Sequence, residues 1–153
     1  MEIKAEIEIS KNPEKIFLWI NNPAKAMLWQ KNVKSGEIIK ETAERIGTTF
    51  KEELEEDGEC LVMYGEIIDF IPNKLISFHI KSKIHNVYVD YSVIGGINKS
   101  TVTVNSKIKW KFPMNLICLV IGQKIKSKIF KQIKSELKEL KILCETIQID
   151  LNN

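Results

Sequence analysis

The last third of the chain has the apolar spacing of a single long helix. Steps of three and four residues place its regularly spaced apolar side chains on one stripe: Ile125, Ile129, Ile133, Leu137, Leu140, Cys144 and Ile147. Lysines fill much of the remaining surface, and Pro113 stands where a helix can begin without losing a hydrogen bond. The spacing predicts a helix over residues 114 to about 147, which at about 1.5 Å per residue spans roughly 50 Å.

Before this helix, alternation of apolar and polar residues is typical of strands. The first alternating stretch is 3–9, and Ser10 to Glu14 follows it as a helix start, with a capping residue ahead of Pro13. A second short helix is expected from residue 24 to about 30. Six further strands are expected at 36–40, 48–55, 60–70, 75–84, 87–94 and 101–110.

Short turn sequences join these strands, including Asp57-Gly58 and Gly95-Gly96, so consecutive strands should pair antiparallel. A sheet with one apolar face needs a cover, and the long helix supplies it. We therefore predict an α+β fold: a curved antiparallel sheet of about six to seven strands wrapped around a long C-terminal helix, with two short helices after the first strand. Residues 1–153 are one domain's length.

Parity along the strands predicts that four polar residues face the helix with the apolar rows: Glu52, Ser82, Tyr91 and Ser106. Buried polar groups need partners. These groups either form hydrogen bonds with a neighbouring residue or a trapped water, or they orient a ligand in a cavity. For Glu52 there is a third interpretation, that it lies at the splayed edge of a strand. The strand at 60–70 is apolar on both sides, so its facing stays open.

Composition and charge narrow the class of protein. A net charge of +3 is too weak to indicate nucleic acid as a partner. Three widely separated cysteines without metal-type spacing indicate free thiols in a reducing compartment. The N-terminus alternates and is charged, unlike a secretion signal, and the apolar run 116–121 is too short to span a bilayer. We expect a cytoplasmic protein without stable membrane insertion, and leave its oligomeric state open.

Few residues offer catalytic chemistry. His79 lies on a polar strand face, whereas His85 shares the inward parity of its neighbours and is either a turn residue or an acid–base group at a cavity rim. Two histidines without a nearby cysteine or carboxylate pair do not indicate zinc. The chain has no nucleophile-elbow, P-loop or dinucleotide motif, so no metal or cofactor is expected and catalysis is left open.

The long helix carries two further ambiguities. Its lysines are either a solvated face or flank an apolar stripe at a membrane surface, although the same stripe is needed to cover the sheet. Gly122 interrupts the helix, where glycine costs roughly 1 kcal/mol relative to alanine. It indicates close contact with a strand, space at the mouth of a cavity, or exposure to solvent.

Four segments match a known pattern together: Ile7-Glu-Ile-Ser with Asn12-Pro-Glu-Lys-Ile-Phe; Asn22-Pro23 with Leu28-Trp29; Gly65-Glu-Ile-Ile-Asp-Phe-Ile-Pro-Asn-Lys-Leu-Ile-Ser-Phe; and Leu137-Lys-Glu-Leu-Lys. Nearly the whole chain resembles the START-like helix-grip superfamily (SRPBCC), most of all its polyketide cyclase/dehydrase branch. Gln30-Lys31 replaces a proline common after the tryptophan, and Ile71-Pro72 replaces a double proline. Both departures fall near the expected cavity mouth.

The resemblance implies a cavity between the long helix and the sheet that binds a small hydrophobic or lipid-like molecule. Members share no catalytic residue set, so no catalytic residue is carried over. We expect these residues to contact the ligand: Trp29, Phe50, Phe78, Ile80, His85, Tyr91, Ser106, Trp110, Ile117, Ile121 and Gly122.

Three functions are consistent with the sequence. The favoured one is a noncatalytic binder, because no acid–base pair is visible in the sequence. The alternative is a cyclase or dehydratase-type enzyme acting on a polyketide-like or aromatic substrate, with Tyr91, His85 or Glu52 moving a proton. The third is an interaction protein whose core is filled.

Overall fold

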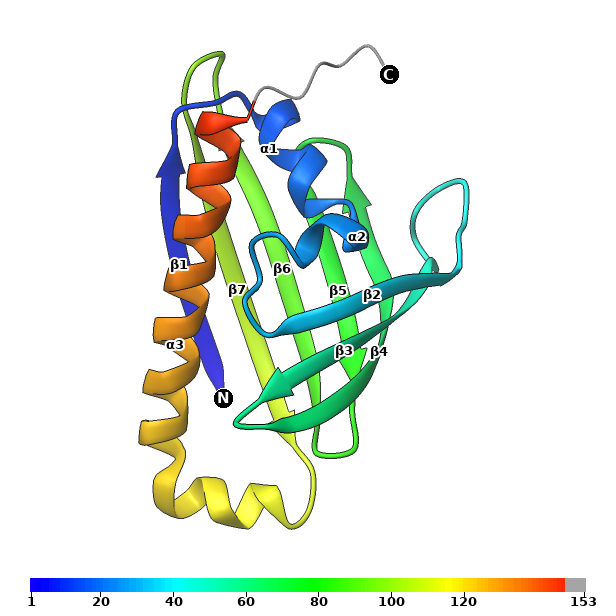
Figure 1. The fold of residues 1–153 in the computed structure, drawn as a ribbon, viewed down its shortest axis with the longest axis vertical. Coiled ribbons are helices and arrows are strands. Elements are labelled where there is room, and N and C mark those ends of the chain that lie inside the picture. The colour runs from blue at the N-terminus through cyan, green and yellow to red at the C-terminus, as the bar shows by residue number, and fades with distance from the viewer. Residues whose placement is uncertain (148–153) are drawn as a thin grey trace.

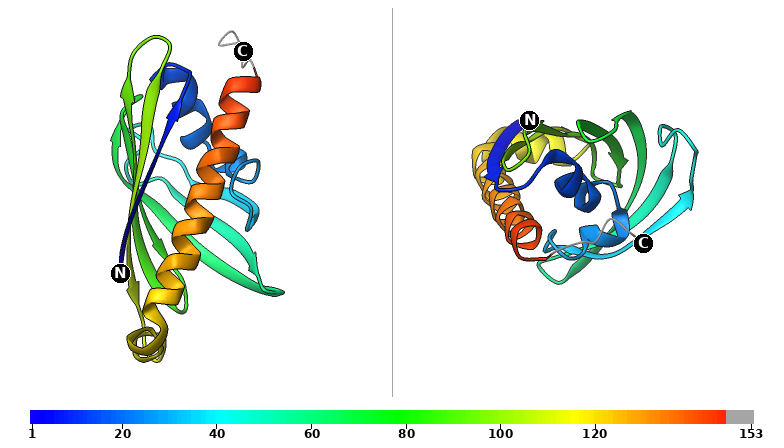
Figure 2. Two further views of the ribbon diagram at one scale, coloured as in Figure 1. Left: turned by 90° about the vertical axis from the view of Figure 1, so that its left-hand side faces the viewer. Right: turned by 90° about the horizontal axis from the view of Figure 1, so that it is seen from above.

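The computed structural model describes residues 1–147. Within them the chain forms a seven-stranded antiparallel sheet in the order β1-β7-β6-β5-β4-β3-β2, with helices on its concave side (Figures 1 and 2). The elements are β1 (Glu2–Ile9), α1 (Pro13–Ile20), α2 (Pro23–Ala26), β2 (Val33–Lys40), β3 (Thr49–Glu56), β4 (Glu59–Ile71), β5 (Leu75–Lys81), β6 (His85–Gly95), β7 (Ser100–Trp110) and α3 (Met114–Thr146). The predicted α+β class and wrapped antiparallel sheet are confirmed.

The register of the sheet puts the predicted inward rows on one face. Phe50 pairs with Gly65, Gly65 with Ile80, Ile80 with Val87 and Val87 with Ile108, so one row crosses five strands. Side chains of this face form the core together with α1 and the second half of α3. Because the sheet is strongly curved, its concave side surrounds the helices (Figure 2).

The strand β4, whose facing the sequence left open, contains a register shift between Ile67 and Asp69. Met63 and Ile67 point inward and Val62 and Ile68 outward on the regular part of the strand. After the shift the parity changes, and Phe70 packs against the core. A β-bulge of this kind explains why Phe70 is apolar although it has the parity of the outward residues, whereas Val62 and Ile68 remain exposed apolar side chains.

The first helix begins as its sequence predicts. The Asn12 side chain accepts a hydrogen bond from the Lys15 backbone N–H at 2.9 Å, and Pro13 occupies the first turn. The second short helix expected over 24–30 is wrong as stated. Only the single turn α2 forms, and backbone bonds from Trp29 N–H to the Ala26 carbonyl (3.1 Å) and from Leu28 N–H to the Lys25 carbonyl (3.0 Å) close tight turns. These turns bury Trp29, so α1 is the one short helix of several turns after β1.

The helix α3 covers the sheet over only part of its length. Its second half buries Leu137, Leu140 and Cys144, and packs against β1. Lys141 Nζ donates to the Glu8 carbonyl at 2.8 Å, and the Ser10 N–H donates to Glu145 Oε1 at 2.9 Å, which attaches this half to the first strand. The first turns lie across the lower end of the molecule, at an angle to the rest (Figure 1). The expectation that the whole helix covers the sheet is therefore not met.

No helix within residues 1–147 is long and apolar enough to cross a membrane.

Candidate functional site

An apolar cavity of about 110 Å³ lies between the middle of the sheet and the α1–α2 segment. Its walls come from β3 to β6 on one side and from the end of α1, α2 and the following turn on the other. The lining residues are Ile20, Ala26, Trp29, Gln30, Phe50, Glu52, Leu54, Met63, Phe78, Ile80, Val89 and Tyr91. The cavity is therefore capped by the short helical segment that follows β1.

Aromatic rings form much of the wall. Phe50 and Phe78 lie edge to face with ring centroids 5.6 Å apart, Phe78 and Tyr91 are 6.2 Å apart, and Tyr91 and Trp29 5.9 Å apart. Edge-to-face pairs of this kind are favourable beyond the area that they bury. Gly65 permits the arrangement, because a Cβ there would collide with the ring of Phe50.

One charged side chain, Glu52, faces this apolar space. Only 8% of Glu52 is exposed to solvent. Burial, and then the negative charge of Glu136 on α3, raises the pKa of Glu52 from 4.5 to about 7. Burial also raises the pKa of Glu136, against a hydrogen bond that Gln132 Nε2 donates to Glu136 Oε1 at 2.9 Å. Glu52 is thus poised to exchange a proton near neutral pH.

Two further polar groups belong to the cavity wall. Burial, followed by the charges of Glu136 and Glu52, raises the pKa of Tyr91, so its hydroxyl stays protonated. The indole Nε1 of Trp29 is buried and has no hydrogen-bond partner among the described residues. A buried donor without a partner is costly, so this N–H is available to an acceptor on a ligand. No group of three or more His, Cys, Asp or Glu side chains in residues 1–147 is placed to hold a metal.

The structure brings five of the expected ligand contacts to the cavity: Trp29, Phe50, Phe78, Ile80 and Tyr91. It places the other six elsewhere: His85, Ser106, Trp110, Ile117, Ile121 and Gly122. The last three belong to the first turns of α3, which do not reach this space. Whether the five bind a ligand stays a prediction.

His85 lies at the start of β6, apart from the cavity lining. Its Nδ1 is 3.0 Å from Ser82 Oγ, and its ring meets Trp110 edge on, with centroids 5.3 Å apart. Burial lowers its pKa, which keeps the imidazole neutral at pH 7. Ser82 and His85, which the sequence placed on the inward side, thus contact each other and not the cavity. This is the turn role that the sequence left open for His85.

Sequence reasoning missed several lining residues. Met63 could not be assigned because its strand is apolar at both parities, and Ala26 and Gln30 depend on how the turn after α2 folds. The charge of Glu136 was missed as well: it does not line the cavity, but it directly precedes Leu137 and therefore lies at the edge of the apolar stripe. A carboxylate at that edge was the available signal for a polar group near the core.

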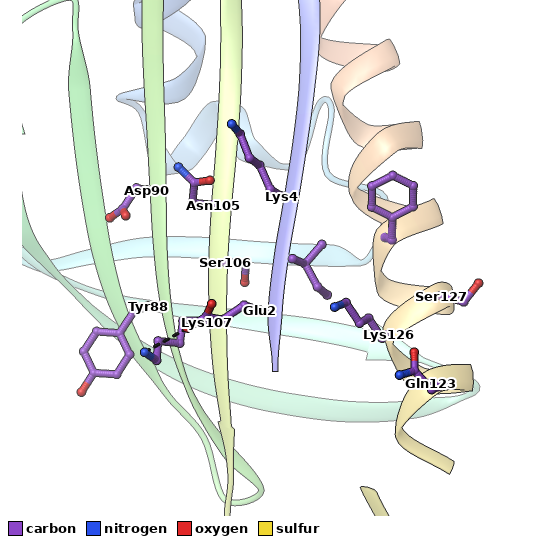
Figure 3. Close-up of a pocket in the computed structure, with 12 residues that line it drawn as sticks. Glu2, Lys4, Tyr88, Asp90, Asn105, Ser106, Lys107, Gln123, Lys126 and Ser127 are labelled. Atoms are coloured by element: carbon purple, nitrogen blue, oxygen red, sulfur yellow. Dashed lines mark ion pairs between the residues drawn. The ribbon is translucent and has the colours of Figure 1, made fainter.

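A second hollow, of about 850 Å³, lies at the edge of the sheet along β1, β7 and β6 and reaches the middle of α3, and the buried Ser106 is among the residues that line it. Figure 3 shows Glu2 and Lys107 paired there on neighbouring strands, with Gln123, Lys126 and Ser127 on the helix. The hollow is open, and most of the residues that line it are polar or charged. Ligand pockets enclose most of the surface of the molecule that they bind, so the smaller and more enclosed cavity fits a binding site better.

Several solved structures share this arrangement of sheet and helices over nearly the whole chain. A START superfamily protein from Mycobacterium smegmatis matches with a TM-score of 0.81 and 15% identity, over 96% of this chain and 99% of that one. The fold is the START-like helix-grip fold. The Zhui aromatase/cyclase from Streptomyces sp. R1128 matches with a TM-score of 0.78 and 9% identity, over 95% and 93%. Ara h 8.0201 matches with a TM-score of 0.68 and 16% identity, over 96% and 99%.

At sequence identities of 9–16%, these matches show a similar fold and nothing about function. No family model matches the sequence, and no curated protein matches it significantly. Any function of this helix-grip protein therefore has to be inferred from its cavity.

Proposed function

We propose that this helix-grip protein binds a small hydrophobic ligand in the cavity between the sheet and the α1–α2 segment. The observation that carries the proposal is an enclosed aromatic and aliphatic wall interrupted by Glu52, Tyr91 and the unpartnered Trp29 N–H. Such a wall suits a ligand with an apolar body and one polar end, because the few polar groups fix its orientation.

The size of the cavity limits the ligand. An engineered apolar cavity of roughly 150 Å³ in another protein holds benzene, and the cavity here has about 110 Å³. A ligand whose buried part is no larger than a single benzene ring is therefore the class that fits with little movement of the wall, and any polar substituent would extend toward the cavity opening. A fatty acid or sterol needs the α2 turn to move outward, since drug-sized ligands occupy roughly 300–1,000 Å³.

The first experiment measures binding of a size series: benzyl alcohol, 2-naphthol and dodecanoic acid. Benzyl alcohol should raise the melting temperature and shift tryptophan emission, because Trp29 lines the cavity. Trp29→Phe should remove the emission change. Trp110→Phe is the matched control, since Trp110 packs on His85 and should leave the response intact.

A cavity-filling variant tests the location. Ile80→Phe adds bulk to the cavity wall and should abolish benzyl alcohol binding while the protein remains folded by circular dichroism. The same substitution at the exposed Ile94 should leave binding unchanged. If no member of the series alters melting or emission in the wild type, the binder is rejected in favour of a filled core.

A cyclase or dehydratase-type enzyme is the second candidate, and one observation favours it. Glu52, with a pKa of about 7, shares the cavity with the protonated Tyr91 hydroxyl. A base with a pKa near the operating pH and an adjacent donor is suited to general acid–base chemistry.

The enzyme hypothesis predicts turnover of a linear β-diketone thioester, followed as new aromatic absorbance. Glu52→Gln and Tyr91→Phe should each reduce the rate by roughly 100-fold or more, and His85→Ala should not. Binding of benzyl alcohol without turnover would reject the enzyme and leave the binder.

A further inference from the structure

Phe112 and the first turns of α3, residues 114–121, form an apolar segment outside the body of the protein. We call this segment the arm. Figures 1 and 2 show this segment projecting at the lower end, away from the concave face of the sheet. Leu119 and Val120 are 82% and 86% exposed, and Phe112, Leu116, Ile117 and Ile121 are exposed as well. Single exposed apolar side chains are ordinary, but a contiguous group marks an interaction surface.

The chain around the arm carries charge of a single sign. Residues 101–135 contain eight lysines and no aspartate or glutamate. Two of these lysines form ion pairs within the protein: Lys107 with Glu2, and Lys128 with Glu56 and Asp57. Lys124 and Lys126, just beyond the arm, have no ion pair among residues 1–147. The arm is therefore an apolar tip beside Lys124 and Lys126, although Glu2, whose pKa is lowered first by Lys107, lies close enough to Lys126 for this lysine to lower it as well.

This charge distribution selects among possible occupants. A second copy docking arm to arm would bring lysines against lysines, which opposes association. A bilayer with anionic lipid accepts apolar side chains at the acyl boundary and places its negative headgroups beside the lysines. We propose that the apolar arm docks reversibly on an anionic membrane surface, with Leu119 and Val120 at its tip.

In this mode of docking the arm contacts the membrane surface at a shallow depth and does not span the bilayer. The arm is a short part of one helix, and no helix in the described part of the chain could cross a bilayer. The second half of α3 remains on β1 through Leu137 and Leu140, so one helix serves the core and the surface with different residues. Docking does not depend on whether the cavity holds a ligand.

The test is co-sedimentation of the full chain with vesicles of phosphatidylcholine alone or with about one third phosphatidylserine. Wild-type protein should bind the anionic vesicles, and binding should weaken as salt rises because exposed charges are screened. The double variant Leu119→Asp with Val120→Asp should lose at least about tenfold in affinity. Lys124→Glu with Lys126→Glu should lose about fivefold or more for each lysine removed.

The matched control is Ile94→Asp with Ile97→Asp, at the β6–β7 turn, where the two side chains are 76% and 84% exposed. This control removes equally exposed apolar residues from another part of the surface and should bind vesicles as the wild type does. Ile80→Phe, which fills the cavity, should also bind as the wild type does.

Three results would overturn the proposal: no binding of the wild type to anionic vesicles, equal loss in the β6–β7 control, or binding that ignores lipid charge. Light scattering without vesicles tests the alternative that a second copy of this chain binds the arm. A dimer that Leu119→Asp with Val120→Asp dissociates, in a protein that ignores vesicles, would assign the arm to a second copy.

Discussion

The two halves of α3 are both rich in apolar residues, yet only one contributes to the core. In the second half, apolar residues recur at steps of three and four, and Leu137, Leu140 and Cys144 are buried. In the first turns, Leu116 to Ile121 is a continuous apolar run, so its side chains point in all directions around the helix, and all of them except the partly buried Cys118 lie exposed. The difference shows that the spacing of apolar residues, and not their number, indicates which part of a helix packs on a sheet.

The largest expected effect tests this difference directly. Leu140 is fully buried and Leu119 is exposed, so Leu140→Ala should destabilise the protein by about 2–5 kcal/mol. Leu119→Ala should change the free energy of unfolding by about 0.5 kcal/mol or less. Urea unfolding of both variants is the measurement, and comparable losses would show that the arm packs on the body in solution.

The second prediction concerns charge, since the packed half of α3 places Glu136 near the buried Glu52. A raised pKa means that folded Glu52 keeps a proton that the unfolded chain releases above pH 4.5. Stability should therefore fall as pH rises from about 4.5 to 7 and level off above that range. The contribution of Glu52 is roughly 3 kcal/mol, and Glu136 acts in the same direction.

Glu52→Gln should remove this part of the pH dependence, measured as urea midpoints between pH 4.5 and 8. Glu53→Gln is the control on the outer face, where a hydrogen bond and charge from Lys51 lower the pKa of Glu53. A wild-type profile that Glu52→Gln does not flatten would mean that Glu52 is solvated and outside the cavity.

The smallest expected effect is at Gly122, which directly follows the exposed apolar run at the start of α3. A Cβ there would have no neighbour within 4 Å, which excludes close contact with a strand. Gly122→Ala should raise stability by up to about 1 kcal/mol through helix propensity. Gly65→Ala is the opposite case, because its Cβ would collide with Phe50, and it should destabilise. A loss of stability in Gly122→Ala would show that α3 requires a glycine at this position.

Much of the fold was predictable because the spacing of apolar residues along a strand or helix indicates which of its side chains are buried. Alternation located β1 and β5 to β7, the Asn12–Pro13 pair located the start of α1, and the stripe located the packed half of α3. The same parity put Phe78, Ile80 and Tyr91 on the inner face, and they line the cavity. These features depend on neighbours a few residues apart, which the sequence displays directly.

The sequence by itself determined the sheet, its inward rows and the packed stripe, because each follows from a period of two or of about 3.6 residues. Tertiary structure alone decided the facing of β4, where a bulge changes the parity, and the direction of the arm. It also decided that Trp29 and Glu52 line one cavity and that Glu136 lies close enough to raise the pKa of Glu52, although the three belong to segments far apart in the chain. Such contacts depend on how the sheet curves and where the helices cross it, and no local period encodes that geometry.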